Sequence, residues 1–185
     1  MCRLQTAESM GNFSSGSQDR CLVFGHVTLR APNGKECFGT ICLQNMTLSL
    51  VGQIIQFALT HRSDPASDAG ICIDEWMIMP NHVHLLLLIP FHCQKFRYSA
   101  VSQTSCSFLD QMTCNHRIKC SSGPVLKRFK RNVKRWTDLY GLDFHWGPGI
   151  TLQLIGDEND LTRIRWHMRR NPEIWESDIL NRKNR

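Results

Sequence analysis

The sequence predicts a mixed α/β (α+β) domain with a ferredoxin-like βαββαβ order, an antiparallel sheet, helices on one face and an additional C-terminal helix. Two observations predict this class. Short apolar runs typical of strands alternate with amphipathic segments of helical periodicity. In addition, Pro80-Asn81 forms a tight turn that joins two of the strands directly. A chain of 185 residues suits one domain with a buried core.

The first half of the chain contributes three strands and one helix to this prediction. Residues 1–21, rich in Ser, Gly and Gln, are expected to form a disordered tail. Phe38–Leu43 is expected to be the first strand, and Thr47–His61, with apolar residues at helical spacing, the first helix. Ile71–Met79 and His82–Ile89 are expected to be the second and third strands, on either side of the turn.

The second helix is expected at Val125–Leu139, after a long mobile linker or insertion at residues 90–124. The linker is expected from its Ser, Cys, Gln and Gly content. The helix is expected from apolar residues at i, i+3, i+7 and i+10, which would form a buried stripe. These residues are Leu126, Phe129, Val133 and Trp136.

The last elements are a fourth strand and a third helix. Phe144–Trp146 and Ile150–Ile155 together are expected to form the strand. Asp157 is expected to cap a helix from Glu158 to about Arg170, which Asn171-Pro172 ends. The domain would then span residues 22–178, leaving residues 179–185 as a C-terminal tail.

Charge and hydropathy indicate the cellular location of the protein and the kind of partner that it binds. The formal charge of +6 and the pI near 9.0 favour an anionic partner. The longest apolar run, Leu85–Ile89, is too short to cross a bilayer, and the N-terminus has no signal-peptide core. We therefore expect a cytoplasmic protein that does not engage a membrane.

The nine cysteines are scattered and are expected to stay reduced. Cys37, Cys42 and Cys72 lie in apolar, strand-like runs and are expected to be small buried hydrophobes. A looser cluster matches no short Cys-x2-Cys zinc knuckle, and its spacing leaves zinc binding open. Its members are Cys106, Cys114, His116 and Cys120.

Two histidines flank a single apolar residue at the start of the third strand. Side chains alternate between the faces of a strand, so His82 and His84 are expected to point to the same side. Two imidazoles side by side are half of a divalent-metal site. The alternative is that both lie on the solvated face of a half-buried strand.

The second helix carries six cations within nine residues. A run of one sign repels itself, and no Glu at i,i+4 relieves it, so we expect contacts to nucleic-acid phosphates rather than a merely solvated face. The cations are Lys127, Arg128, Lys130, Arg131, Lys134 and Arg135. The last helix extends this footprint with Arg163, Arg165, Arg169 and Arg170.

The segment Met79-Pro80-Asn81-His82-Val83-His84 resembles the signature of REP-associated tyrosine transposases, which belong to the HUH (His, hydrophobic, His) group of single-strand DNA transposases. Further segments are similar to that family in the same order: Thr40–Asn45, Leu48–Ile55, and Trp146 with Asp157–Pro172. The resemblance covers about residues 22–178.

The resemblance implies an HUH-endonuclease type of fold and metal-dependent cleavage and rejoining of single-stranded or hairpin DNA in a bacterial cell. In that family two histidines and a polar residue on the last helix hold Mg²⁺ or Mn²⁺, which implies His82, His84 and Asn171 as ligands. Related transposases often act as dimers, so the resemblance also implies a homodimer.

The sequence departs from the family pattern at the position of the nucleophile, where it has His167 instead of a tyrosine. Three interpretations follow. The protein has lost cleavage and is a DNA-binding relative that kept the fold and the basic surface. Alternatively, His167 joins the metal ligands, or it attacks phosphorus itself, since imidazole is a competent nucleophile.

Overall fold

The computed structural model describes residues 20–61, 70–92 and 108–181. Its centre is a four-stranded antiparallel sheet in the order β4-β5-β1-β6. These strands are β1 (Arg20–Arg30), β4 (Cys72–Ile78), β5 (His82–His92) and β6 (Ile150–Ile155). With α1 (Leu50–Thr60) between β1 and β4, and α2 (Phe108–Leu139) between β5 and β6, the order is the ferredoxin-like one. The predicted fold class is confirmed.

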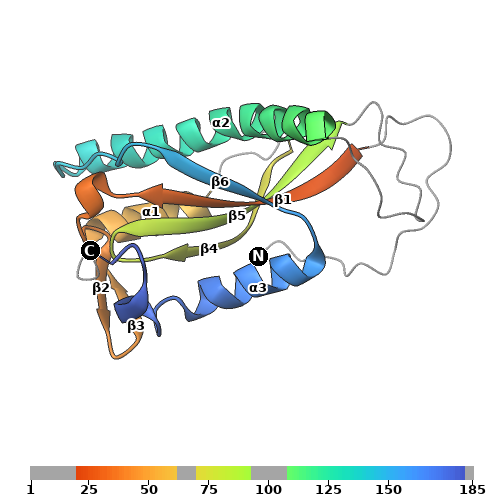
Figure 1. Ribbon diagram of the computed structural model, residues 1–185. Coiled ribbons are helices and arrows are strands. Elements are labelled where there is room, and N and C mark those ends of the chain that lie inside the picture. The colour runs from red at the N-terminus through yellow and green to blue at the C-terminus, as the bar shows by residue number, and fades with distance from the viewer. Residues whose placement is uncertain (1–19, 62–69, 93–107, 182–185) are drawn as a thin grey trace.

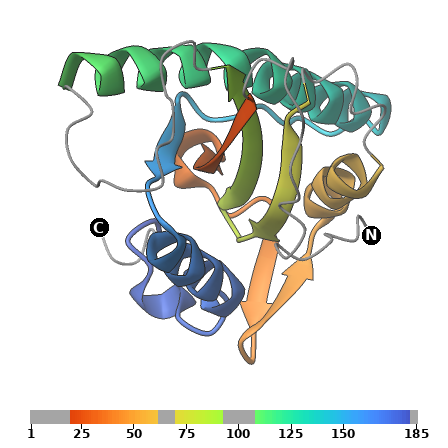
Figure 2. The ribbon, with the colours of Figure 1, turned by 90° about the vertical axis from the view of Figure 1, so that its right-hand side faces the viewer.

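The sheet is covered on both faces, not on one as expected. One apolar cluster joins the sheet to α1 and α2, and a second, smaller cluster joins the opposite face to α3 (Glu158–Arg170). Figure 1 shows α2 and α3 on opposite sides of the sheet, and Figure 2 shows α1 beside the strands. The C-terminal helix therefore closes the face that a four-stranded ferredoxin-like sheet would leave open.

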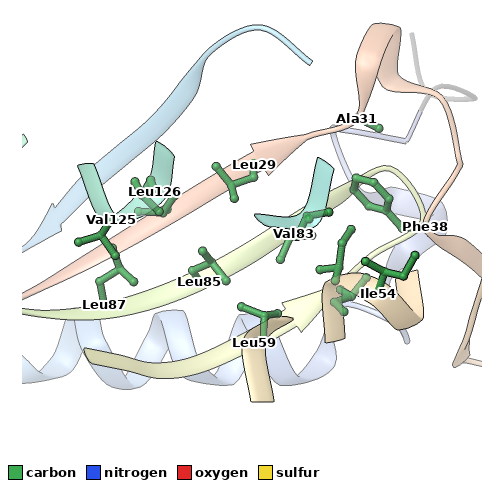
Figure 3. Packing of buried hydrophobic residues seen from close by; sticks show 14 of the residues in the cluster. Leu29, Ala31, Phe38, Ile54, Leu59, Val83, Leu85, Leu87, Val125 and Leu126 are labelled. Atoms are coloured by element: carbon green, nitrogen blue, oxygen red, sulfur yellow. The ribbon is translucent and has the colours of Figure 1, made fainter. Parts of the chain in front are cut away.

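The alternation of side chains along β5 explains the two faces. Val83, Leu85 and Leu87 are fully buried toward α1 and α2 (Figure 3). His82 and His84 alternate with these positions and so point to the other face, where Leu86 packs in the cluster with α3. The register of the strand thus places both histidines on the α3 side of β5, which is one of the two central strands of the sheet.

The first strand of the sheet was predicted in the wrong place. Arg20–Arg30 forms β1, and the chain then makes a separate hairpin, β2 (Gly39–Cys42) and β3 (Asn45–Leu48). Leu43 and Gln44 connect the hairpin with positive φ angles of 49° and 63°, as a two-residue type I′ turn requires. Figure 2 shows the hairpin projecting from the sheet.

Helix α1 begins at Leu50, three residues later than predicted, because Ser49 caps it. The Ser49 hydroxyl accepts from the Gly52 amide at 3.2 Å and donates to the Cys37 carbonyl at 2.7 Å. Gly52 lets the helix approach closely, since a Cβ there would lie 2.0 Å from the Phe38 carbonyl oxygen. The first turn of α1 is therefore fixed against the fully buried Phe38.

Helix α2 is longer than predicted. Residues 108–124 are helical rather than part of a linker, β5 extends to His92, and residues 93–107 lie outside the described part. The buried stripe also differs, because Trp136 is 39% exposed whereas Thr137 is fully buried. Position 137 lies eleven residues after Leu126, close to three full turns, and so stays on the same face.

The remaining elements partly match the prediction. Helix α3 begins and ends where expected, with the Asp157 carboxylate accepting from the Asp160 amide at 2.8 Å and Asn171 as the C-cap. Phe144 and Trp146 are not in a strand, although both pack on the core beside Phe38. Only Ile150–Ile155 forms the fourth strand.

The predicted ends of the domain fall partly on described residues. Residues 1–19 and 182–185 lie outside the description, but Arg20 already belongs to β1. Beyond residue 178 the chain still packs on the domain, since Asn181 is 1% exposed and its amide donates to the Trp175 carbonyl at 3.0 Å. No helix in the described residues is long and apolar enough to span a membrane.

The cysteines are less buried than predicted. Cys42 and Cys72 are exposed, and Cys37 is half-buried, which raises the pKa of its thiol. Cys42 and Cys72 lie on edge strands, β2 and β4 respectively, which leaves these residues open to solvent. Of the looser cluster, Cys106 and the side chains of Cys114, His116 and Cys120 lie outside the described residues.

Candidate functional site

The His82 and His84 side chains meet on the α3 side of the sheet. Their Nε2 atoms lie 2.9 Å apart, and the ring centroids are 4.5 Å apart with the planes nearly perpendicular. His82 is completely buried, and His84 is half-buried. The predicted pairing of the two imidazoles is therefore present, and the solvated-face alternative does not describe His82.

Asn81 determines the tautomer of His82. The amide nitrogen of Asn81 donates to the Leu180 carbonyl at 2.7 Å and to the Gly34 carbonyl at 3.3 Å, so its oxygen faces His82. That oxygen lies 2.7 Å from His82 Nδ1 and can only accept, so Nδ1 carries the proton. The lone pair of His82 is therefore on Nε2, the atom that faces His84.

A third histidine lies on the neighbouring strand. His26 Nε2 is 3.0 Å from His84 Nδ1, the two rings stack at 4.9 Å, and the Thr28 hydroxyl lies 3.2 Å from the same Nδ1. The β1–β5 register places Thr28 directly opposite His84, so the side chains share one face. In the His84 tautomer that carries its proton on Nδ1, His26 and Thr28 can each accept that proton, and the Nε2 lone pair of His84 then faces that of His82.

Burial keeps these imidazoles neutral. Desolvation, followed by the positive charge of Arg30 and the nearby His26, lowers the pKa of His82 to about 3. The pKa of His84 falls well below its usual value through burial and the neighbouring histidines, and burial also lowers that of His26. At neutral pH the imidazoles thus offer lone pairs without first losing a proton.

The metal-free protein is expected to lose stability as the pH falls below about 6.5. A histidine with a folded-state pKa below its unfolded value binds protons preferentially in the unfolded chain. The stabilisation from the neutral His82 is therefore complete above pH 6.5 and is lost as the pH falls toward 3, its folded-state value. Urea midpoints measured in EDTA between pH 7 and 5 test this, before most carboxylates titrate. A His82→Leu, His84→Leu variant should show a flatter profile, and an equally steep one would contradict the assignment.

The donor set fits a divalent cation. Two imidazole nitrogens about 2.1 Å from one ion, at a right angle, lie about 3 Å apart, close to the distance observed between the two Nε2 atoms. Within the described ranges, no group of three or more His, Cys, Asp or Glu side chains is arranged to hold a metal ion. A third protein ligand would therefore be of another type, such as an amide oxygen, or would require a rearrangement.

The other two predicted site residues make no hydrogen bond to the pair in the described structure. Asn171, at the end of α3, is buried, but its side chain makes no hydrogen bond to either histidine in the described structure. His167 is exposed, and its ring contacts Trp166 edge-on at 5.3 Å. Met168, next along the helix, is the residue that packs on the sheet.

The segment after α3 closes over His82. The ring centroid of Trp175 lies 6.1 Å from that of His82, and the Asp178 carboxylate lies 3.7 Å from His82 Nε2. Together with the hydrogen bond from Asn81 to Leu180, these contacts tie the C-terminal segment to the start of β5. Asp178 places a negative charge beside the nitrogen that would face a cation.

The six basic residues of α2 differ in exposure and in partners, and Arg128 is half-buried. Lys127, Arg131 and Arg135 recur every four residues, are exposed and enter no ion pair within the described ranges. Lys134 instead pairs with Asp138, which corrects the expectation that no acidic partner relieves the run. Lys130 turns inward, donating to the Gly147 carbonyl at 3.5 Å and lying 5.9 Å from the centre of the Trp146 ring, and its partial burial lowers its pKa.

The arginines of α3 are all paired with carboxylates. Arg165 bonds Asp74, and Arg169 bonds Glu75 at 2.7 Å, so both link the helix to β4. The other two pairs are within the C-terminal region: Arg163 with Asp160 and Arg170 with Glu173. These arginines hold the helix in place, and their predicted contact with DNA would require them to leave or share these partners.

Comparison with known proteins identifies a relative. No family model matches the chain. An uncharacterized protein of Haemophilus influenzae is 30% identical over 159 residues, which is 85% of this chain and 84% of that protein. The chain belongs to the family of that protein. The match therefore spans most of both chains.

Two solved structures with a partly similar arrangement are a transposase and a candidate transposase. One is a REP-associated tyrosine transposase bound to a REP hairpin, with a TM-score of 0.44 and 13% identity over 89% of this chain and 73% of that one. Another is a protein of Deinococcus radiodurans designated a candidate transposase, with a TM-score of 0.39 and 14% identity over 85% of this chain and 96% of that one.

Several residues of the site were missed in the sequence. His26, Thr28 and Arg30 alternate along β1 on the face of the histidine pair, and this period of two was the available signal. Asp178 and Trp175 had no such signal, because only the tertiary fold brings the C-terminal segment to His82.

Proposed function

We propose that this member of the family is a transposase-like DNA strand transferase of the HUH group, acting on single-stranded or hairpin DNA with Mg²⁺ or Mn²⁺. The observation that supports it best is the pair of Nε2 atoms 2.9 Å apart, with Asn81 setting the tautomer of His82. The three residues responsible, Asn81, His82 and His84, are the ones that carry the resemblance to the HUH signature. Both histidines are held neutral by burial, as ligands must be.

His82 and His84 would hold the cation in this proposal, with Asn171 as the third ligand that the resemblance implies. When bound, the cation would polarise a phosphodiester and stabilise the charge of its transition state. The chain itself supplies the orientation. Asn81 fixes one imidazole, His26 and Thr28 orient the other, and Asp178 adds a negative charge beside them.

His167 takes the position of the nucleophile. Its imidazole is exposed on α3 and so is open to a strand. In the attack, a nitrogen of His167 would form a bond to phosphorus while the bond to the 3′ oxygen breaks, and that oxygen would leave as a hydroxyl after taking a proton. Attack on the phosphohistidine by a 3′ hydroxyl would reverse these steps and rejoin the DNA.

Hairpin DNA with a single-stranded flank, incubated with the protein and Mn²⁺, tests the proposal. We expect a covalent protein–DNA adduct that is resolved by denaturing electrophoresis and is acid-labile, as a phosphoramidate bond is. The His167→Ala variant should bind the hairpin and form no adduct. Binding by the wild type without cleavage at any Mn²⁺ concentration would leave the protein a DNA-binding relative that does not cut.

Helix α2 is proposed as the main electrostatic contact for the DNA. Because Lys127, Arg131 and Arg135 are exposed and unpaired within the described residues, replacing all three by Gln should reduce the slope of log K against log salt by about two to three units. Fluorescence anisotropy with labelled hairpin measures this. Arg131→Gln and Lys134→Gln form the matched pair, since Lys134 is held by Asp138 and should matter less. Equal effects of the two single variants would argue against a specific role for this row.

A further inference from the structure

A pocket beside the histidine pair contains an arginine that no other part of the proposal uses. The pocket has a volume of about 270 Å³ and lies where β1 ends, β5 begins and the chain approaches β6. Arg30, Asn33, His82, Pro148 and Leu180 are among its lining residues, and none of the described lining residues is acidic. A positively charged pocket of this size is suited to an anionic group.

Arg30 and His82 are direct neighbours. The β1–β5 register pairs them across the two strands, so their side chains leave the same face with Cβ atoms about 5 Å apart. The guanidinium is close enough for its positive charge to lower the pKa of His82. The same residue pair thus joins the pocket to the proposed metal site.

The guanidinium of Arg30 has no partner among the described residues. Arg30 is exposed, and its side chain enters no ion pair or hydrogen bond within the described structure, whereas each arginine of α3 is paired with a carboxylate. Asp178 approaches His82 from the C-terminal segment but does not line the pocket. A cation left unpaired beside a proposed cation site is repelled by it unless an anion lies between them.

We propose that Arg30 binds a phosphodiester of the DNA strand in this pocket, beside His82 and His84, the residues that would hold the cation. The planar guanidinium can donate two parallel hydrogen bonds to phosphate oxygens, which a lysine cannot reproduce. The inference rests on the proposed function and adds to it a residue that positions the strand.

Equilibrium binding of a labelled ten-nucleotide thymidine strand in Mn²⁺ tests the role of Arg30. Arg30→Gln should lower the affinity about tenfold and reduce the salt slope by about 0.7, with Arg30→Lys in between. Lys35→Gln is the matched control, because Lys35 is exposed nearby but does not line the pocket. Affinity for Mn²⁺ alone, measured by electron paramagnetic resonance, should not fall in Arg30→Gln, since a repelling charge has been removed.

Each other outcome overturns the inference. Arg30→Gln within twofold of the wild type, or equal losses in Arg30→Gln and Lys35→Gln, would exclude a specific contact. A fall in both DNA and Mn²⁺ affinity would indicate a structural role. Displacement of the strand by millimolar inorganic phosphate from the wild type but not from Arg30→Gln would assign the pocket to a free phosphate ion. Failure of the wild type to bind any strand would instead contradict the proposed function itself.

Discussion

Leucine at position 82 or 84 is expected to lower the affinity for Mn²⁺ by about 100-fold or more. Leucine resembles histidine in size but has no donor atom, so each variant would remove one of the two nitrogens that lie 2.9 Å apart. Changes to residues that only orient a ligand commonly cost 10- to 100-fold, and loss of a ligand should cost at least as much. Electron paramagnetic resonance or calorimetric titration of the purified protein measures the affinity.

Three further variants test whether the loss of Mn²⁺ affinity is specific to the histidine pair and the residues that orient it. His145→Leu removes an exposed imidazole whose contact in the structure is with Asp143, and it should bind Mn²⁺ as the wild type does. Asn81→Ala and His26→Leu should each weaken Mn²⁺ binding by about 10- to 100-fold. Each variant removes a hydrogen-bond partner that orients one of the two imidazoles, His82 or His84. Thermal unfolding confirms that each variant is folded. Wild-type affinity in folded His82→Leu and His84→Leu proteins would exclude a metal site at this pair.

Alanine at position 52 is expected to destabilise the fold by about 3 kcal/mol, near the upper end of what overpacking of a core costs. Its Cβ would lie 2.0 Å from the Phe38 carbonyl oxygen, which also accepts from the Ser49 amide at 3.0 Å. The first turn of α1 would have to move from Phe38, and Phe38 packs on Phe144 and Trp146. The urea midpoint, with an unchanged m-value, reports the loss.

Gly123→Ala provides a control that is expected to change the stability in the opposite direction. Gly123 lies inside α2, and a Cβ there would meet no atom within 4 Å. Alanine should therefore stabilise the helix by about 0.5–1 kcal/mol through the lower entropy of the unfolded chain. If Gly52→Ala were as stable as the wild type, the close approach of α1 to Phe38 would not be required for the fold.

The sequence was informative where local chemistry alone determines the structure. Pro80-Asn81 reverses the chain, and the alternation that follows it places His82 and His84 on one face. Asp157 and Asn171 likewise bound α3 through their own caps. Each of these features depends on residues within a few positions of one another, which a pattern in the sequence can reveal.

The predictions were wrong where contacts between segments distant in the sequence determine the structure. Arg20–Arg30 alternates as a strand should, but it adjoins a polar tail, and Phe38–Leu43 offered a second apolar run for the same role. Residues 108–124 have weak helical propensity, and they are helical in continuity with the packed half of α2. The link between Arg165 and Asp74 joins residues 91 positions apart, so no local pattern could reveal that this arginine is paired.

The sheet separates the histidine pair from the unpaired cations of α2, since α2 and α3 lie on its two sides (Figure 1). Under the proposed function, DNA binding by α2 and strand cleavage at the histidine pair would then be separable properties of one molecule. A DNA substrate that contacts both the cations of α2 and the histidine pair must pass around an edge of the sheet. This path sets a minimum length for the DNA. Short single strands would be cut without being firmly held, and stems alone would be held without being cut.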